Sequence, residues 1–230
     1  MWYNMGSKGK AVYGMSEIIG HAESFIRGLF ENEFSGHDFF HSMRVCRTAV
    51  RIAETEGADA EETALIALLH DADDIKLSPA THENMDRARA FLEKEGVSEK
   101  RIRRILTAIS EISFRGTDSI APSAAEGKCV QDADRLDALG AIGIARTFAY
   151  GGSRGRAMYD PDEKPLENMT EAEYRASRSA SVNHFYEKLF HLKDLMNTEY
   201  GRKLAEKREA FMKEYLSHFY AEWEGNDEED

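Results

Sequence analysis

Apolar residues recur three and four positions apart along almost the whole chain, and this period constrains the fold more than any other feature. Ile18, Ala22, Phe25 and Leu29 are one such series, and residues at this spacing are neighbours on one face of an α-helix. No segment alternates convincingly between apolar and polar residues, the period of two that is typical of strands. The sequence therefore predicts an all-α protein.

Local signals divide this helical pattern into segments. Four residues that precede apolar series are expected as N-caps: Ser16, Asp59, Ser98 and Ser123. Two of them, Asp59 and Ser123, are each followed three positions later by Glu, so a capping box is expected there. Glycine in a helix interior costs stability, so the glycines at 140 and 143 indicate a close neighbouring helix. Helices are expected over residues 16–30, 37–53, 59–70, 83–95, 98–113, 123–146, 170–181 and 204–223.

Length and charge limit the kind of protein this is. The 230 residues fit one compact domain with helical additions: we expect a loose leader over 1–15, the folded domain with a C-terminal helical part over 16–225, and an acidic tail over 226–230. The net charge of -12 argues against binding to nucleic acid or to an anionic membrane surface. With no segment of ~20 apolar residues and no signal peptide, the sequence predicts a cytoplasmic protein. Cys46 and Cys129 are expected to be packing residues.

The apolar run from Ala64 to Leu69 ends in the adjacent pair His70-Asp71, and Asp74 follows closely. If the helix continues, these three polar residues share one face. A helix anchored in a core directs such a polar end into the protein, where a charge needs a partner. A metal ion is the partner that we expect for adjacent imidazole and carboxylate groups.

Two further segments carry similar side chains. His37, His41 and Arg44 recur at spacings of four and three, so one helical face carries two imidazoles and a guanidinium. The segment Asp132-Ala-Asp134-Arg-Leu-Asp137 supplies carboxylates far along the chain. A buried hydrogen-bonded network is the alternative interpretation of these residues.

Four motifs combine these segments. They are HDxxHxxRV at 37–45, HDxxDxK at 70–76, ISFRG at 112–116 and QDADRLDALGAIGIARTF at 131–148. Together they resemble the HD-domain metal-dependent phosphohydrolase superfamily, and a bacterial branch of it in particular. The resemblance extends over roughly 16–225.

The resemblance implies an HD-domain helical fold with additional C-terminal helices and one divalent metal ion. The family pattern assigns its ligands to His41, His70, Asp71 and Asp134, since the last family ligand is followed by a basic residue and Leu. The implied reaction is hydrolysis of a phosphoester or phosphoanhydride in a phosphorylated small molecule, and members of this branch are nucleoside triphosphate pyrophosphohydrolases that release pyrophosphate. Asp73 departs from the family pattern and is either solvent-facing or a determinant of metal preference.

Two imidazoles and two carboxylates also fit this chemistry on their own. Such ligands suit Mn, Fe, Co, Ni or Zn, with Mg as a further possibility, and leave positions for water and a phosphate oxygen. The metal acidifies that water, and Asp74 is expected to take its proton. The alternative for Asp74 is an exposed carboxylate at a helix end.

Substrate contacts are assigned more broadly. We expect phosphate to be bound by basic residues near the motifs, although each of them could instead form a surface ion pair, and the irregular segment 151–169 to close over it. For His37 three roles are considered: a hydrogen-bond partner of a ligand, a ligand of a second metal, or a residue at the start of a helix. For Asp137 the role is likewise left undecided, with a partner of a ligand as one choice. A nucleotide phosphomonoesterase and a non-catalytic nucleotide sensor are the competing functions. The basic residues are Arg44, Lys76, Arg115, Arg135 and Arg146.

Overall fold

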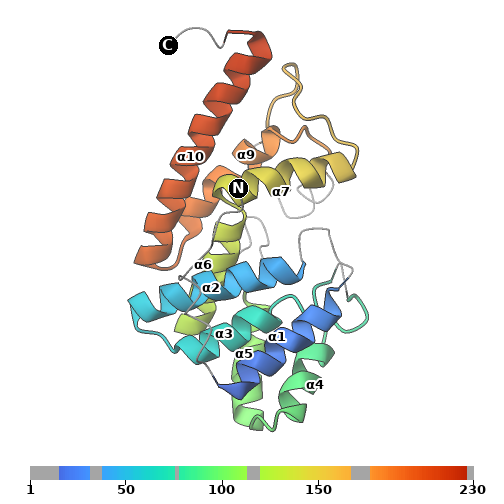
Figure 1. Ribbon diagram of the computed structural model, residues 1–230, viewed down its shortest axis with the longest axis vertical. Coiled ribbons are helices and arrows are strands. Elements are labelled where there is room, and N and C mark those ends of the chain that lie inside the picture. The colour runs from blue at the N-terminus through green and yellow to red at the C-terminus, as the bar shows by residue number, and fades with distance from the viewer. Residues whose placement is uncertain (1–15, 32–37, 76–77, 113–119, 167–176, 227–230) are drawn as a thin grey trace, which may run out of the picture. The chain divides into compact units, whose positions relative to one another are not determined.

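The computed structural model describes residues 16–31, 38–75, 78–112, 120–166 and 177–226 (Figure 1). Within these ranges the chain forms helices, turns and irregular segments and contains no strand, which confirms the all-α prediction. The predicted leader lies outside the described residues, as does the tail from 227 onwards. Among the described helices none is long and apolar enough to cross a membrane. The chain divides into two compact units, with the boundary between Ala133 and Asp134.

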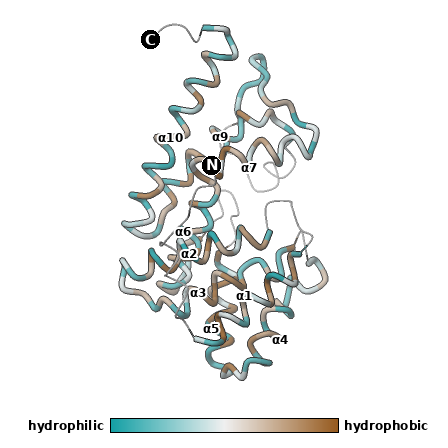
Figure 2. Tube along the Cα trace, in the orientation of Figure 1, coloured by the Kyte–Doolittle hydropathy of each residue, from teal (hydrophilic) through white to brown (hydrophobic). Residues whose placement is uncertain are grey.

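The first unit is built around a central helix, α3 (Ala60–Leu69). Every residue from Glu62 to Leu69 is buried, as expected for a helix enclosed on all sides. Figure 2 shows the apolar half of α3 in brown, among the neighbouring helices. Three helices pack against α3, and α4 (Asp86–Lys94) packs on one of them. Those three are α1 (Glu17–Leu29), α2 (Phe39–Glu56) and α5 (Glu99–Ser110).

The start of α3 follows the sequence prediction only in part. The carboxylate of Asp59 accepts a hydrogen bond from the backbone N–H of Glu62 at 2.9 Å, so the predicted N-cap is confirmed. Glu62 does not close a capping box, because its carboxylate binds Arg101 at 2.8 Å and Arg104 at 2.6 Å on α5. The backbone N–H of Asp59 donates instead to Glu126 at 3.3 Å. Ion pairs between the buried Glu62 and two partly exposed arginines therefore join α3 to α5.

The other predicted caps have mixed outcomes. Ser16 and Ser98 occupy N-cap positions, but their side chains make no capping hydrogen bond. The capping box predicted at Ser123 is wrong: Ser123 binds Glu111 through its N–H and hydroxyl at 2.8 and 2.9 Å. Helix α6 (Ala125–Asp137) begins two residues later.

The predicted helix over 123–146 is two helices, α6 and α7 (Gly140–Ser153). Gly140 has φ 72°, and a Cβ there would lie 3.1 Å from the Arg208 side chain. This confirms the expected close approach of another helix, α10 (Glu199–Glu224). At Gly143 a Cβ would lie 2.2 Å from the carbonyl oxygen of Ala138. The glycine there is required by the turn between α6 and α7, and not by a neighbouring helix.

The second unit holds α7, α9 (Asn183–Glu187), the 3₁₀ helix η2 (Leu189–Leu195) and the long α10 (Glu199–Glu224). Helix α10 packs against α7 and η2. Aromatic rings fill this core. The ring centroid of Phe148 is 6.1 Å from the ring centroids of both Phe185 and Phe219. The helix predicted over 170–181 is not found in its described part, since residues 177–182 are not helical. Cys46 and Cys129 are buried free thiols, as predicted.

Candidate metal centre

His41 is positioned by the first turn of α2. Asp38 is the N-cap of this helix, and its carboxylate accepts a hydrogen bond from the backbone N–H of His41 at 2.6 Å. The N-cap interaction satisfies one of the free N–H groups of the first turn and fixes where the helix begins. The His41 side chain is fully buried.

The pair His70-Asp71 lies at the end of α3, where the helix turns into a tighter segment. The helix ends at Leu69. Beyond it, Ala72 N–H binds the carbonyl of Leu69 at 3.0 Å and Asp74 N–H binds that of Asp71 at 3.1 Å. These are contacts between residues three apart, as in a 3₁₀ helix. The expectation that Asp74 continues one α-helical face from His70 is therefore wrong.

His41, His70 and Asp71 converge on one point in the first unit. Asp71 Oδ2 is 3.4 Å from His41 Nε2 and 3.3 Å from His70 Nε2. One potential ligand atom from each residue lies within 4.8 Å of the others. The side chains of His70 and Asp71 are only 4% and 10% exposed. Helix α2 and the end of α3 thus place two imidazoles and a carboxylate together out of water.

The hydrogen bond of the His70 ring suits a metal ligand. Its Nδ1 lies 2.7 Å from the carbonyl oxygen of Ala67, and a carbonyl only accepts hydrogen bonds, so Nδ1 carries the hydrogen. In the neutral ring Nε2 then presents a lone pair. This buried atom has no hydrogen-bond partner among the described residues and lies 3.3 Å from Asp71 Oδ2. Ligand atoms bound at about 2.1 Å lie roughly 3.0–3.4 Å apart around one ion. The observed separations therefore fit a divalent cation.

The Asp73 side chain binds the backbone at the start of α4. Its carboxylate accepts hydrogen bonds from the backbone N–H groups of Arg87 at 3.2 Å and Ala88 at 3.0 Å, in the first turn of α4. Its own carbonyl oxygen lies 2.8 Å from His82 Nδ1. The side chain is buried, so the solvent-facing alternative is wrong. Asp73 joins the segment behind Asp71 to α4.

Comparison with known proteins gives the family. Residues 38–139 match the model of the HD domain. The uncharacterized protein YpgQ of Bacillus subtilis (strain 168) is 35% identical over 208 residues, which cover 90% of this chain and 94% of YpgQ. The chain belongs to the HD-domain phosphohydrolase superfamily.

Solved structures of this superfamily have a similar fold. A Lactobacillus plantarum protein superposes with a TM-score of 0.80 at 37% identity, covering 92% of this chain and 99% of that one. An HD-superfamily hydrolase from Bacillus thuringiensis has a TM-score of 0.72 at 41% identity, with coverages of 90% and 96%. YpgQ has been crystallised in complex with ADP, and that structure has a TM-score of 0.72 at 32% identity, with coverages of 89% and 94%. These likenesses support a hydrolase.

The carboxylates of α6 differ in burial and partners. Asp132 is fully buried and Asp134 is half-buried. Asp137 is buried and accepts a hydrogen bond from Arg146 Nη1 at 2.6 Å, which forms an ion pair within the second unit. Asp134 also belongs to the second unit, and its role as a ligand in this HD domain stays a prediction.

The expected phosphate-binding residues have varied surroundings. Arg135 is buried and donates to the carbonyl of Leu195. Arg146 binds Asp137, and Arg44 is half-buried on α2. Their contact with substrate stays a prediction. His37, Lys76 and Arg115 lie outside the described residues.

Lys188 is a cation that the sequence analysis missed. Burial lowers the pKa of its ammonium group to about 8, with the charge of Asp134 opposing this shift and that of Arg146 adding to it. Lys188 therefore lies near the charges of Asp134, Arg135 and Arg146 in the second unit. Because it stands between a five-residue helix and a 3₁₀ helix, no periodic pattern or motif marks it.

Proposed function

We propose that this HD-superfamily protein is a metal-dependent nucleoside triphosphate pyrophosphohydrolase that releases pyrophosphate. The observation that carries the proposal is the buried convergence of His41, His70 and Asp71, with ligand atoms within 4.8 Å of one another. HD domains bind divalent metal ions, and this geometry supports one here.

The proposed ligand set combines the observed cluster with the family pattern. His41, His70 and Asp71 would hold the ion. Asp134 is our choice for a fourth ligand because the last ligand of the family pattern is followed by a basic residue and Leu, as Asp134 is by Arg135 and Leu136. Nitrogen and oxygen donors of this kind suit Mn, Fe, Co, Ni or Zn and leave positions open. The bound ion would supply an acidified water and neutralise phosphate charge.

The chain's own residues position the reacting groups. The hydrogen bond to the Ala67 carbonyl orients the His70 ring, since a ligand with a fixed tautomer needs a partner for its other nitrogen. The segment after Asp71 is held through its backbone, where Ser78 N–H binds the carbonyl of Asp74 at 2.7 Å. We propose that the Asp74 carboxylate accepts the proton of the attacking water.

A nucleotide with several phosphates is the substrate that fits the charges best. The complex of YpgQ with ADP supports a nucleotide. The second unit contains Arg135, Arg146 and Lys188 in a protein of net charge -12. Guanidinium groups form paired contacts with phosphate oxygens, and a triphosphate requires more cations than a monophosphate. We therefore propose that these three groups bind the phosphate chain.

Product analysis on matched mono-, di- and triphosphates of one nucleoside tests this function. The metal-loaded protein should convert the triphosphate to monophosphate and pyrophosphate in equal amounts and leave the monophosphate nearly unchanged. In H₂¹⁸O the label enters the monophosphate if water attacks the α phosphorus and pyrophosphate if it attacks the β phosphorus. The Asp71→Ala variant is the control for a contaminating enzyme.

Two other results would move the function elsewhere. Orthophosphate released mainly from the monophosphate would identify a phosphomonoesterase. Nucleotide binding without any product, over the range of metals named above, would identify a sensor.

A further inference from the structure

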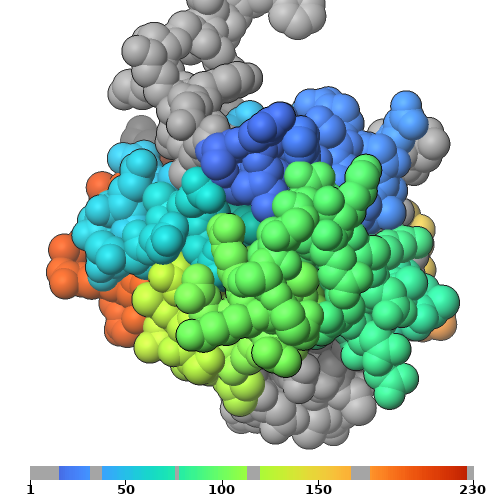
Figure 3. Space-filling model, turned by 90° about the horizontal axis from the view of Figure 1, so that it is seen from below, coloured from blue at the N-terminus to red at the C-terminus, as the bar shows by residue number. Residues whose placement is uncertain are grey.

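A groove lies between α1 and α4 in the first unit. It has a volume of about 660 Å³ and is lined by described residues of the first unit only. Ligand sites of small molecules have volumes of about 300–1,000 Å³. Figure 3 shows the face of the molecule on which α1, in blue, lies next to the green region that includes α5. None of the residues that line the groove belongs to the metal centre or to the proposed phosphate-binding group.

The groove contains a pair of stacked aromatic rings. Phe25 of α1 and Phe91 of α4 have ring centroids 5.0 Å apart and an interplanar angle of 23°. Phe91 is buried, while Phe25 is partly exposed. A planar ring of a ligand can stack on the free part of such a surface, since offset stacking is favourable for aromatic groups.

Cationic side chains surround these rings. Arg87, Lys94 and His21 all line the groove, and among its lining residues, which are all described, Glu95 is the one acid. His21 Nδ1 lies 2.7 Å from Glu95, and this contact raises the pKa of the imidazole. His21 and Glu95 therefore match each other, and Arg87 and Lys94 are the further cations of the lining. In a chain of net charge -12, two such cations beside the rings favour an anionic ligand.

Arg87 is held in place before any ligand binds. Its Nη1 donates to the hydroxyl of Ser78, and its backbone N–H donates to Asp73 at 3.2 Å. A cation that is already ordered loses less conformational entropy on binding. Its guanidinium also suits phosphate oxygens in particular.

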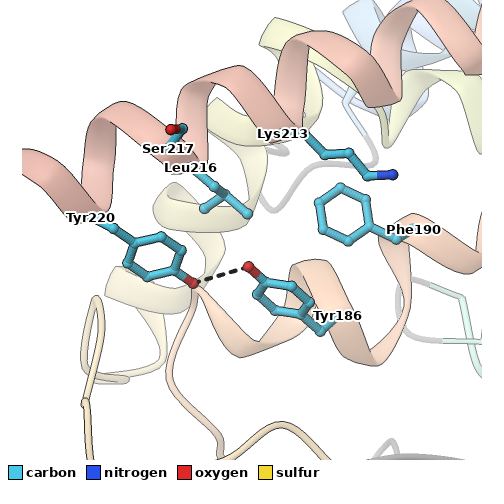
Figure 4. A pocket seen from close by; sticks show the side chains of 6 residues that line it. All are labelled: Tyr186, Phe190, Lys213, Leu216, Ser217 and Tyr220. Carbon is cyan, nitrogen blue, oxygen red and sulfur yellow. Dashed lines mark hydrogen bonds between the residues drawn. The ribbon is translucent and has the colours of Figure 1, made fainter. Parts of the chain in front are cut away.

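A second pocket of the molecule is a less suitable anion site, because its cation is already paired with an acid. It lies between α9, η2 and α10, with a volume of about 310 Å³ (Figure 4). Its lysine, Lys213, lies 2.6 Å from Glu209. The hydroxyls of Tyr186 and Tyr220 are 3.2 Å apart and bind each other. The lysine and the two phenol groups of this pocket thus already have partners within the protein.

We propose that the α1–α4 groove is a binding site for a nucleoside monophosphate, with the base on Phe25 and the phosphate between Arg87 and Lys94. The site would be separate from the metal centre. Binding there does not depend on the proposed reaction, because it can be measured without turnover.

Calorimetric titration of the full chain in excess chelator tests the ligand class. Chelation removes the ion through which phosphate would bind at His41, His70 and Asp71, and the paired variants below separate the groove from the proposed phosphate-binding residues of the second unit. AMP should bind with a dissociation constant below about 1 mM, and adenosine and ribose 5-phosphate should each bind at least about tenfold more weakly, since each lacks one half of the interactions. No AMP binding, or equal binding of AMP and ribose 5-phosphate, would overturn the proposal.

Paired variants locate the site. Lys94→Glu should weaken AMP binding by about tenfold or more, whereas Lys100→Glu, the same change at an exposed position of α5, should leave it unchanged. Phe25→Leu keeps an apolar side chain but removes the ring, and it should weaken AMP without changing the affinity for ribose 5-phosphate. Circular dichroism checks that each variant is folded. Equal effects of Lys94→Glu and Lys100→Glu, or loss of binding in Asp71→Ala alone, would place AMP elsewhere and reject the groove.

Discussion

Asp73 Oδ2 accepts a hydrogen bond from the backbone N–H of Ala88 at 3.0 Å, so the carboxylate two residues after Asp71 caps another helix. Arg87 N–H reaches the second oxygen of the same carboxylate. The first turn of a helix leaves N–H groups without partners, and α4 begins after Met85, whose side chain provides no cap. Two neighbouring acids of one motif therefore lie in different surroundings: Asp71 lies in the candidate metal centre, and Asp73 holds the start of α4.

Replacing Asp73 should cost stability and leave the metal in place. Asp73→Ala removes the acceptor for two N–H groups, and loss of a cap costs about 1–2 kcal/mol. Urea unfolding of the metal-free protein should show this loss, and elemental analysis should show unchanged metal content. Asp71→Ala is the matched variant, with the opposite outcome: lost metal and a smaller change in the stability of the metal-free protein. Loss of metal from Asp73→Ala would show that the capping contact also controls the centre.

The fourth ligand can be tested by comparing two carboxylates of α6. Asp134→Ala should lose bound metal, because Asp134 is the acid that we assign to the ion. Asp137→Ala should retain metal but unfold more easily, because it leaves Arg146 without its partner at 2.6 Å. Metal content per chain and urea unfolding should be measured for both. Full occupancy in Asp134→Ala with loss in Asp137→Ala would reverse the assignment.

Local patterns in the sequence were sufficient for most helices and for the cap at Asp59. Helical periodicity acts over a few residues, so it predicted α1, α2 and α3 without knowledge of the fold. The pair His70-Asp71 could be identified in the same way, because an apolar run ends there. Its convergence with His41 was expected from the family resemblance and is found in the structure.

Contacts between distant residues could not be predicted in this way. Glu62 has the spacing of a capping box, yet it binds arginines about 40 positions later on α5. Asp73 caps a helix 14 residues away. Lys188 is half-buried, and its lowered pKa results from the packing of the second unit and not from any pattern of its own neighbours in the sequence. Such roles depend on which helices meet, and that information is absent from a local period.

Acid should destabilise the protein in part through His184. Burial, together with the charges of Lys188 and Arg156, lowers the pKa of this imidazole from 6.5 to about 3. Between about pH 6.5 and pH 3 the unfolded chain binds a proton at this residue and the folded chain does not. The contribution of His184 to the free energy of unfolding is therefore fully present above about pH 6.5 and falls progressively toward pH 3.

The size of the effect can be measured with one variant. Between about pH 7 and about pH 5.5 the loss due to His184 should be about 1 kcal/mol. Urea unfolding at the two pH values should show a smaller loss for His184→Gln than for the natural chain. His191→Gln is the control, since His191 is exposed. Equal losses in the natural chain and His184→Gln would show that the pKa of this imidazole is the same in the folded and unfolded chain.

Asp74 provides the sharpest test of the proposed reaction. It follows the metal centre in a segment whose backbone is fixed by hydrogen bonds at both of its own peptide groups, to Asp71 and Ser78. Asp74→Asn keeps the size of the side chain but removes its ability to take a proton. If Asp74 is the base, the variant should retain metal and lose about two to four orders of magnitude in turnover of the nucleoside triphosphate. Its substrate KM should change little, since a proton acceptor for water adds little to substrate binding. Unchanged turnover with metal bound would exclude Asp74 as the base, and loss of metal would show instead that it helps to hold the ion.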